Sequence, residues 1–396
     1  MLESLFPGPQ DVLPPTPSWY QHAAVGICIL SIFLPPGPIR LSTGLLLLIL
    51  IIHATFWTYA PTYNEYTVST TSMTTLFAWI DFVACHDLEH DFWKVEKDAE
   101  GHVVEKRVPN GVWEKLKWST LFWFGYRKIG WNIQVSSISP AVPSDYPRSR
   151  FLRQMFLKTI KMYLSLDLAS TSLRLLSHSR NNADFFKEPL FTQVLSGWAT
   201  ASRAYFGMSF IYHIAAFIAV LLSLTPLSSW PPINGSFRQN FFSVRQTWGR
   251  LWHQFIRRYC TSAGRAVTRI CHFKKGGFAS RYTQLWIGFV VSALMHAPPA
   301  VMWSDRGFWQ AMAFLSQPAA IMVEDLVIHC GKVVGLRDNG FIRSVGYLWT
   351  FLWFSYSLRF WVATVPAQYA EGDELPSLIK YVIKRFEVKS VYGVEY

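Results

Sequence analysis

The apolar residues of this chain are gathered into eight segments that polar and proline-rich stretches separate. A helix that crosses a bilayer needs about 20 residues, because each residue adds only about 1.5 Å along the helix axis. The segments are residues 22–34, 41–57, 71–85, 155–176, 205–225, 282–303, 309–328 and 345–365, of which the fourth is interrupted by charges. We therefore predict an all-α, polytopic membrane protein with about eight transmembrane helices, in a range of seven to nine.

The stretches between these segments show no internal repeat and no low-complexity linker. The longest polar stretch, residues 86–153, carries charges of both signs. The first seventeen residues are proline-rich and contain no Lys or Arg, so they do not have the form of a cleavable signal peptide. We expect residues 1–396 to form one continuous membrane-embedded domain.

The composition agrees with a membrane protein. Hydrophobic residues make up 51% of the chain and charged residues 16%, whereas soluble domains carry about 25% charged residues. The mean hydropathy is +0.18. The 18 Trp, 17 Tyr and 30 Phe residues suit the membrane interface, where amphipathic rings are favoured. This composition argues against a soluble cytosolic enzyme and against a disordered chain.

The formal net charge is +12, and its distribution matters more than its size. No Asp or Glu occurs between Pro189 and Ser304. The basic residues of this acid-free stretch include Arg238, Arg245, Arg250, Arg257, Arg258, Arg265, Arg269, Lys274, Lys275 and Arg281. Apolar spans flank the basic run, so nucleic acid is not the expected partner. Anionic lipid or a phosphorylated cofactor fits better, and the preference for positive charge on the cytosolic side explains the run equally well.

The same charge rule predicts the topology. If residues 226–281 lie in the cytosol, eight crossings place residues 86–153 there too and both ends of the chain in the lumen. The N-terminal tail agrees, because it contains Glu3 and Asp11 but no basic residue. We expect a multi-pass protein of the endoplasmic reticulum membrane.

Ionisable side chains inside apolar spans are costly and are therefore functional candidates. His53, His213 and His296 qualify. If its helix enters from the cytosol at Tyr282, His296 lies about 21 Å deep. A neutral imidazole there could act as a general base toward an alcohol. The alternative for all three is a histidine that only bonds to a neighbouring helix.

A second candidate cluster spans residues 243–259. Its aromatic and apolar residues Trp248, Trp252, Phe255, Ile256 and Tyr259 recur at helical spacing, which predicts one amphipathic helix. Arg250, His253, Arg257 and Arg258 flank this face. Such a helix could be only a membrane-surface anchor. In the functional interpretation, its arginines contact cofactor phosphates and His253 faces an active-site opening.

Two further segments carry weaker signals. Asn132, within residues 126–135, could orient a substrate carbonyl or a loop backbone, although packing alone is the simpler role. His86 and His90 have the i, i+4 spacing of a metal site, but a helix end at the interface is the better interpretation. The five cysteines form no CxxC pair, so we expect neither a metal nor a disulfide framework.

Taken together, three of these segments resemble the fungal wax-synthase-like branch of the membrane-bound O-acyltransferases. The matching segments are residues 127–132, with Ile-Gly-Trp-Asn, residues 243–253, with Trp-Gly-Arg-Leu-Trp-His, and residues 292–296, which end in a late histidine. The resemblance covers residues 127–365. Thr247 stands where the family usually has an aromatic residue, and Ala297 where an acidic residue is common.

The resemblance implies a helical body around an intramembrane tunnel, acyl-CoA entering from the cytosol, and an alcohol arriving from the bilayer. Similar fungal proteins acetylate terpenoid and meroterpenoid hydroxyls, so we expect an acetyl-CoA-dependent O-acetyltransferase. His296 would be the general base, and His253 would position the donor or stabilise the oxyanion. Asn132, Trp248, Trp252 and Gln254 would shape the substrate site. Arg245, Arg250, Arg257 and Arg258 would contact the CoA phosphates.

Two alternatives remain open. A long-chain wax ester or sterol ester synthase shares this chemistry and differs only in the volume of the tunnel. A transporter or lipid-binding membrane protein belongs to another class, and paired inverted repeats, which many transporters contain, are not evident here.

Overall fold

The computed structural model describes residues 13–60, 63–97, 100, 102–125, 127–136, 138, 142–143, 145–178, 185–302, 307–364, 376–382 and 385. Within these residues, eight helices have 15 or more residues. They are α1 (Trp19–Phe33), α2 (Pro38–Trp57), α3 (Tyr63–Trp79), α6 (Arg148–His178), α7 (Leu190–Leu221), α11 (Phe278–Val301), α12 (Gly307–Val333) and α13 (Gly340–Val362). Each overlaps one of the eight predicted apolar segments.

Shorter elements connect the long helices. The polar insertion contains α4 (Leu88–Asp91), a hairpin of antiparallel strands β1 (Lys94–Lys97) and β2 (Val103–Lys106), and α5 (Val112–Phe124). Before α11 lie α8 (Phe237–Asn240), α9 (Val244–Gln246) and α10 (Arg257–Ile270). The described part of the chain contains two π-helical turns, η2 (Ile80–Ala84) and η5 (Thr247–Leu251), and two 3₁₀ turns, η3 (Phe185–Lys187) and η4 (Leu227–Ser229).

The prediction of an all-α, polytopic membrane protein is confirmed. Within the described residues, α2, α7, α11 and α12 are long and apolar enough to cross a bilayer. Many large apolar side chains of these helices are exposed, for example Leu45 and Ile49 on α2 and Leu326 on α12. Lipid tails are the environment that such side chains require. The number of crossings stays a prediction.

The helix that contains the fifth predicted span begins earlier than its apolar segment, because α7 starts at Leu190 rather than near residue 205. The first half of α7 carries polar side chains that lower its hydropathy but are buried against α13. Gln193 accepts a hydrogen bond from Arg359 Nη1 at 3.1 Å. Trp198 Nε1 donates to Ser355 Oγ at 2.9 Å. Helix–helix hydrogen bonds therefore extend this helix beyond its apolar part.

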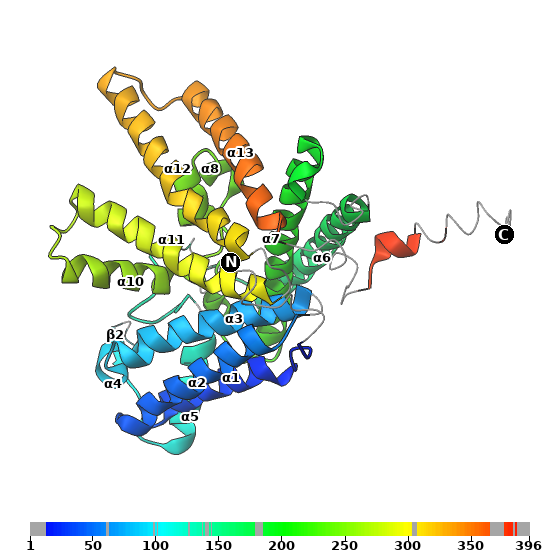
Figure 1. The fold of residues 1–396 in the computed structure, drawn as a ribbon. Coiled ribbons are helices and arrows are strands. Elements are labelled where there is room, and N and C mark those ends of the chain that lie inside the picture. The colour runs from blue at the N-terminus through cyan, green and yellow to red at the C-terminus, as the bar shows by residue number, and fades with distance from the viewer. Residues whose placement is uncertain are drawn as a thin grey trace.

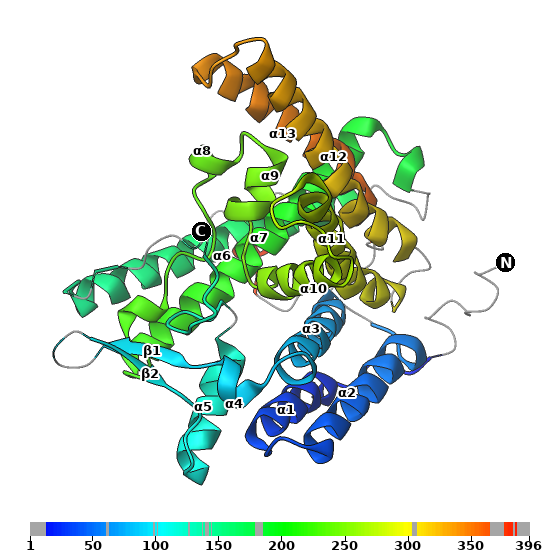
Figure 2. The ribbon, with the colours of Figure 1, turned by 90° about the vertical axis from the view of Figure 1, so that its left-hand side faces the viewer.

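The long helices form three groups (Figure 1). Helices α1, α2 and α3 pack together with α5, and their shared core includes Phe82, Phe122 and Trp131. Helices α6 and α7 form a second, antiparallel pair. Helices α10, α11 and α12 follow one another in the third group, where α10 lies along α11 and α13 joins α12 to α7 (Figure 2). The acid-free segment between α7 and α11 lies among these groups.

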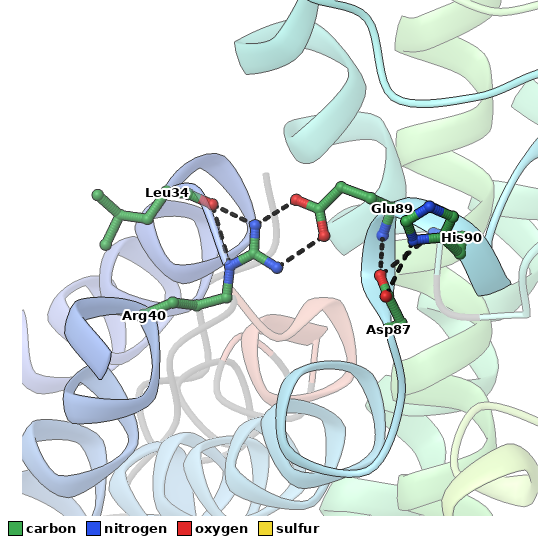
Figure 3. A network of polar contacts seen from close by, with 5 residues as sticks. All are labelled: Leu34, Arg40, Asp87, Glu89 and His90. Carbon is green, nitrogen blue, oxygen red and sulfur yellow. Dashed lines mark hydrogen bonds and ion pairs between the residues drawn. The ribbon is translucent and has the colours of Figure 1, made fainter. Parts of the chain in front are cut away.

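A buried ion pair fixes the polar insertion to the first group. Arg40, near the start of α2, bonds through Nη1 to Glu89 Oε2 at 2.8 Å and also donates to the Leu34 carbonyl (Figure 3). Asp87 caps α4 by accepting from the backbone N–H groups of Glu89 and His90. The segment with the two spaced histidines is thus a helix end, as predicted, and Glu89 docks it on α2.

Candidate active site

His296 lies near the end of α11, where its hydrogen bond defines the tautomer. Nδ1 is 2.7 Å from the carbonyl oxygen of Ser292. A carbonyl can only accept, so Nδ1 carries the hydrogen and Nε2 keeps its lone pair. The imidazole packs on Phe314 of α12, with ring centroids 4.3 Å apart. No hydrogen bond from a described residue engages Nε2, so this atom can accept a proton.

The prediction of one amphipathic helix over residues 243–259 is wrong. Helix α9 passes into the π-helical turn η5, in which the Trp252 N–H donates to the Thr247 carbonyl at 2.8 Å. Trp252 then adopts extended backbone angles, φ −69° and ψ 153°, and α10 begins only at Arg257. Single π turns inside helices are frequent at functional sites. The break removes residues 252–256 from a helical surface and places His253 in a connecting segment.

The break leaves backbone carbonyl groups without the N–H donors that a continuous helix would supply, and two polar side chains donate to them instead. Gln254 Nε2 donates to the Trp252 carbonyl at 2.6 Å and to the Trp248 carbonyl at 3.3 Å. Arg257 Nη1 donates to Gln254 Oε1 at 2.7 Å and also to the Gly249 carbonyl. Gln254 and Arg257 therefore hold the shape of the turn, and Gln254 is buried within it.

His253 sits between the rings of Trp252 and Phe255, with centroids at 5.5 and 5.2 Å. Its Nδ1 is buried and has no hydrogen-bond partner among the described residues. Burial lowers the pKa of His253 to about 3, with further lowering by the nearby His296 and Arg127. His253 is therefore neutral at physiological pH. A chain of ring contacts joins the two predicted histidines, because the ring of Trp252 contacts that of His253 and lies 6.0 Å from that of Trp248. The ring of Trp248 in turn lies near Phe314, which packs on His296.

Trp248 and Trp252 form one wall of an apolar cavity of about 250 Å³. The remaining wall comes from α7, α8, α13 and the residues next to α8, and it includes Trp198, Tyr205, Phe241, Phe354, Leu358 and Trp361. The ring of Trp248 also lies 6.3 Å from that of Phe314, which packs on His296. The two tryptophans thus stand between the histidines and the cavity.

Three of the four predicted phosphate-binding arginines are engaged inside the protein. Arg257 braces the turn, as described above. Arg258 Nε bonds to Asp81 Oδ2 of η2 at 2.6 Å, and Asp81 is only 4% exposed. Arg245 forms a two-bond ion pair with Asp325 of α12. The structure therefore gives these three arginines partners within the protein, and phosphate binding by them stays a prediction. Arg250 is exposed, and no described residue forms a hydrogen bond or ion pair with its side chain.

Asn132 joins two loops. Its Nδ2 donates to the Asp91 carbonyl at 2.8 Å, and its Oδ1 accepts from the Trp93 N–H at 3.2 Å. The neighbouring Arg127 donates to the Pro231 carbonyl at 2.9 Å and to Tyr212 Oη at 2.6 Å. This segment therefore links the polar insertion to the loop that precedes α8, and the amide of Asn132 is used by the protein's own backbone.

Two buried acceptors on α12 organise the site, and the sequence reasoning missed both. Glu324 accepts from Ser243 Oγ at 2.6 Å, the Val244 N–H at 2.7 Å and Trp349 Nε1 at 3.2 Å. Gln317 Oε1 accepts from Trp248 Nε1 at 3.1 Å and from Trp353 Nε1 at 2.9 Å. Each acceptor joins α12 to α13 and to the 243–253 segment. The sequence did carry a signal for Glu324, because a carboxylate within the apolar segment 309–328 is costly and is therefore a functional candidate.

Comparison with known proteins agrees with this site. A model of the membrane bound O-acyl transferase family matches residues 230–317, which include both histidines. Acetyltransferase sirH of Leptosphaeria maculans is 28% identical over 316 residues, which cover 74% of this chain and 76% of sirH. Acetyltransferase eriL of Hericium erinaceus is 29% identical over 69% of this chain and 73% of eriL.

A third relative carries a different name. O-Mevalon transferase macI of Penicillium terrestre is 27% identical over 69% of this chain and 68% of macI. No solved structure matches the chain. The resemblance to membrane-bound O-acyltransferases of fungal secondary metabolism is confirmed, and the chain is an acyltransferase enzyme.

Proposed function

We propose that this acyltransferase moves an acetyl group from acetyl-CoA to a hydroxyl group of a lipophilic secondary metabolite, such as a terpenoid or meroterpenoid. The observation that carries the proposal is the pair of histidines in one neighbourhood, one with a free Nε2 and the other held neutral. The names of sirH and eriL support the acetyl group. We place the whole chain, residues 1–396, in one acyltransferase domain of the endoplasmic reticulum membrane.

The reaction is a direct transfer in a ternary complex. Nε2 of His296 accepts the hydroxyl proton as the alcohol oxygen attacks the thioester carbonyl carbon. The C–S bond then breaks, and the proton passes from His296 to the departing CoA thiolate. A general base in this role contributes about 10²- to 10⁴-fold to the rate.

His253 stabilises the negative charge that develops on the thioester carbonyl oxygen during this step. A neutral imidazole carries one N–H group, and that group donates to the oxyanion of the tetrahedral intermediate. The depressed pKa keeps the ring in this neutral form throughout the physiological range. Gln254 and Asn132 then serve as positioning residues, because the protein's own backbone occupies their amides.

The donor is held from the cytosolic side. Arg250 is the one member of the predicted arginine set that is exposed and has no ion-pair partner among the described residues, so we retain it as a phosphate contact. Arg245, Arg257 and Arg258 have the structural roles described above.

The apolar cavity supports a small substrate. Pockets for drug-sized ligands usually measure about 300–1,000 Å³, and this cavity measures about 250 Å³. Its aromatic wall suits the ring system of a terpenoid alcohol. A long acyl chain would need more space, so the cavity volume supports an acetyl donor over the long-chain alternative.

A donor competition experiment tests this proposal. Microsomes that contain the protein are given acetyl-CoA or palmitoyl-CoA, each with the same set of lipophilic alcohols. We expect acetyl esters to form faster than palmitoyl esters. Faster palmitoyl transfer would establish the long-chain alternative, and the absence of ester with either donor would overturn the proposal that these lipophilic alcohols are the acceptors.

A further inference from the structure

The structure divides the basic residues of the acid-free stretch into two sets. The first set, near the site, is bound internally through Arg245, Arg257 and Arg258. The second set surrounds the turn from α10 to α11. It consists of Arg265, Arg269, Lys274, Lys275 and Arg281, all exposed and without a side-chain hydrogen bond or ion pair to any described residue. We call residues 265–281 the basic tip.

Large apolar side chains alternate with these cations. Ile270 is 76% exposed and Phe278 is 67% exposed, and Phe273 lies between them in the turn with 39% exposure. Positive charge on the cytosolic side follows from topology alone. That rule does not account for three large apolar side chains that are exposed beside the cations.

The basic tip is a well-formed structure. Gly264 brings α10 close to α11, because a Cβ there would lie 2.9 Å from the Gln284 Cα. The Phe273 N–H donates to the Thr268 carbonyl at 3.0 Å, which closes the end of α10. The tip lies at the end of the α10–α11 pair that points away from α6 and α7 (Figure 1). It is therefore a fixed, projecting surface.

We propose that the basic tip is a binding surface for anionic phospholipid in the cytosolic leaflet. Its cations would meet lipid phosphates and its apolar side chains would enter the boundary with the acyl chains, as interfacial segments do. Each Lys or Arg near an anionic membrane contributes about 1 kcal/mol to such binding. None of these residues lines the apolar cavity, so the surface is separate from the proposed reaction site.

This surface has a consequence for the site. The opposite end of α10 begins at Arg257, which braces the turn that carries His253. A lipid contact at the basic tip fixes α10 at a defined depth in the interface. The lipid contact would then hold one end of α10, and the hydrogen bonds of Arg257 to Gly249 and Gln254 hold the other end.

A natural cysteine provides the probe. Cys271 lies in the tip and is exposed, as are Cys85 and Cys330, whereas Cys28 is buried. In a variant with Cys85→Ser and Cys330→Ser, a polarity-sensitive fluorophore is attached to Cys271. The full-length protein is placed in nanodiscs of phosphatidylcholine alone or of phosphatidylcholine with phosphatidylserine. We expect phosphatidylserine to shift the emission to shorter wavelength and high salt to reverse part of that shift.

Matched charge variants test the assignment. Lys274→Gln with Lys275→Gln should weaken the shift, and the further changes Arg265→Gln and Arg269→Gln should remove it. The control is Lys332→Gln with Arg337→Gln, which changes two exposed cations, one in the last turn of α12 and one in the connection to α13, and it should keep the shift.

Several results would overturn the proposal. These are equal emission in the two kinds of nanodisc, or a shift that survives the fourfold variant. A shift produced in detergent by CoA alone would assign the tip to the cofactor phosphates rather than to lipid. The measurement uses no acyl transfer, so it stands independently of the proposed function.

Discussion

Burial of His253 in an aromatic environment has a measurable cost at low pH. Its pKa of about 3 lies below the ordinary value of 6.5, so the unfolded chain takes up a proton between these values while the folded chain does not. Stability is therefore full above about pH 6.5 and is lost as the pH falls towards 3.

The first prediction follows from this shift. At pH 5 the wild-type protein should lose about 2 kcal/mol relative to neutral pH through His253 alone, because each pKa unit corresponds to about 1.4 kcal/mol. Thermal unfolding in detergent at pH 7.5 and pH 5 measures the loss. His253→Asn has no titrating group here and should show a smaller loss. An identical pH dependence in both proteins would contradict the burial of His253.

The second prediction concerns Glu324, which accepts hydrogen bonds from Ser243, Val244 and Trp349. Glu324→Gln presents an amide NH₂ group to some of these donors, and each buried group left without a partner costs about 1–3 kcal/mol. We expect lower thermal stability and at least a tenfold loss of ester formation. The neighbouring Asp325→Asn is the control, because it weakens only two contacts outside the core, the partly exposed ion pair with Arg245 and the hydrogen bond from Tyr282 Oη. Equal effects of the two changes would refute the positioning role of Glu324.

At the scale of elements, the two π-helical turns are joined across the molecule. Asp81 of η2 bonds to Arg258, which follows the segment after η5, and the Arg258 guanidinium lies over the rings of Phe82 and Phe92, at 5.3 Å from each. This contact couples the first helix group to the start of α10. It is a buried pair, so its loss affects stability first.

The third prediction tests this coupling. Arg258→Gln leaves the Asp81 carboxylate buried without its partner, and the loss of one partner of a buried pair costs about 3–5 kcal/mol. The double variant Asp81→Asn with Arg258→Gln should be more stable than Arg258→Gln alone. Thermal unfolding of the three proteins measures the coupling. Arg343→Gln, in an exposed pair with Asp338, should change little. A selective rise in the KM for acyl-CoA without loss of stability would instead restore a phosphate-binding role for Arg258.

The sequence predicted the long helices well, because apolar runs determine them directly. It could not predict the break after Trp252, since the aromatic spacing of residues 248–259 is the same whether or not the helix continues. The break depends on Gln254 and Arg257, whose side chains satisfy the freed carbonyls. The partners of Arg245 and Arg258 were equally invisible, because they lie 80 and 177 residues away.

In the candidate site, too, the sequence indicates single residues but not their contacts with distant residues. His296 and His253 could be chosen from span depth and from the family resemblance. Glu324 could have been chosen as a carboxylate within an apolar segment, whereas Gln317 carried no such signal. Only the packing of α12 against α13 shows that Glu324 meets Trp349 and that Gln317 meets Trp353.

At the scale of the whole molecule, polar contacts between helices agree with the predicted eight-span topology. Gln310, at the start of α12, bonds to Tyr66 at the start of α3 and to Thr364 after α13. These three positions share the predicted lumenal side. Arg40 and Glu89 share the predicted cytosolic side. With eight alternating crossings, the residues of each contact therefore lie on the same side of the membrane, as their hydrogen bonds require.

The fourth prediction tests this topology. Cys85, Cys271 and Cys330 are exposed, and eight crossings place all three in the cytosol. A membrane-impermeant maleimide should label them in sealed microsomes. Ser18→Cys, in an otherwise cysteine-free protein, should be labelled only after permeabilisation. Labelling of Ser18→Cys in sealed vesicles, or protection of Cys271, would require a different number of crossings.

Residues Asn234-Gly235-Ser236 form an N-glycosylation sequon, and the positive charge of the surrounding segment places it in the cytosol. The Asn234 side chain is partly buried, and its Nδ2 donates to Ser209 Oγ at 3.0 Å. Glycosyl transfer occurs only on the lumenal side, so the eight-span topology predicts that Asn234 stays unmodified, and cysteine labelling tests the same topology in three further places.

The most direct test of the account is ester formation from radiolabelled acetyl-CoA by the wild-type protein and by His296→Ala. The variants are compared at equal expression in the same microsomes with the same lipophilic alcohols. We predict acetyl ester from the wild type and a loss of at least about 100-fold in His296→Ala, the lower limit for a general base. His329→Ala, which changes an exposed histidine of α12, should retain full activity. Acetyl transfer by His296→Ala above about a tenth of the wild-type rate would contradict the central role of this residue.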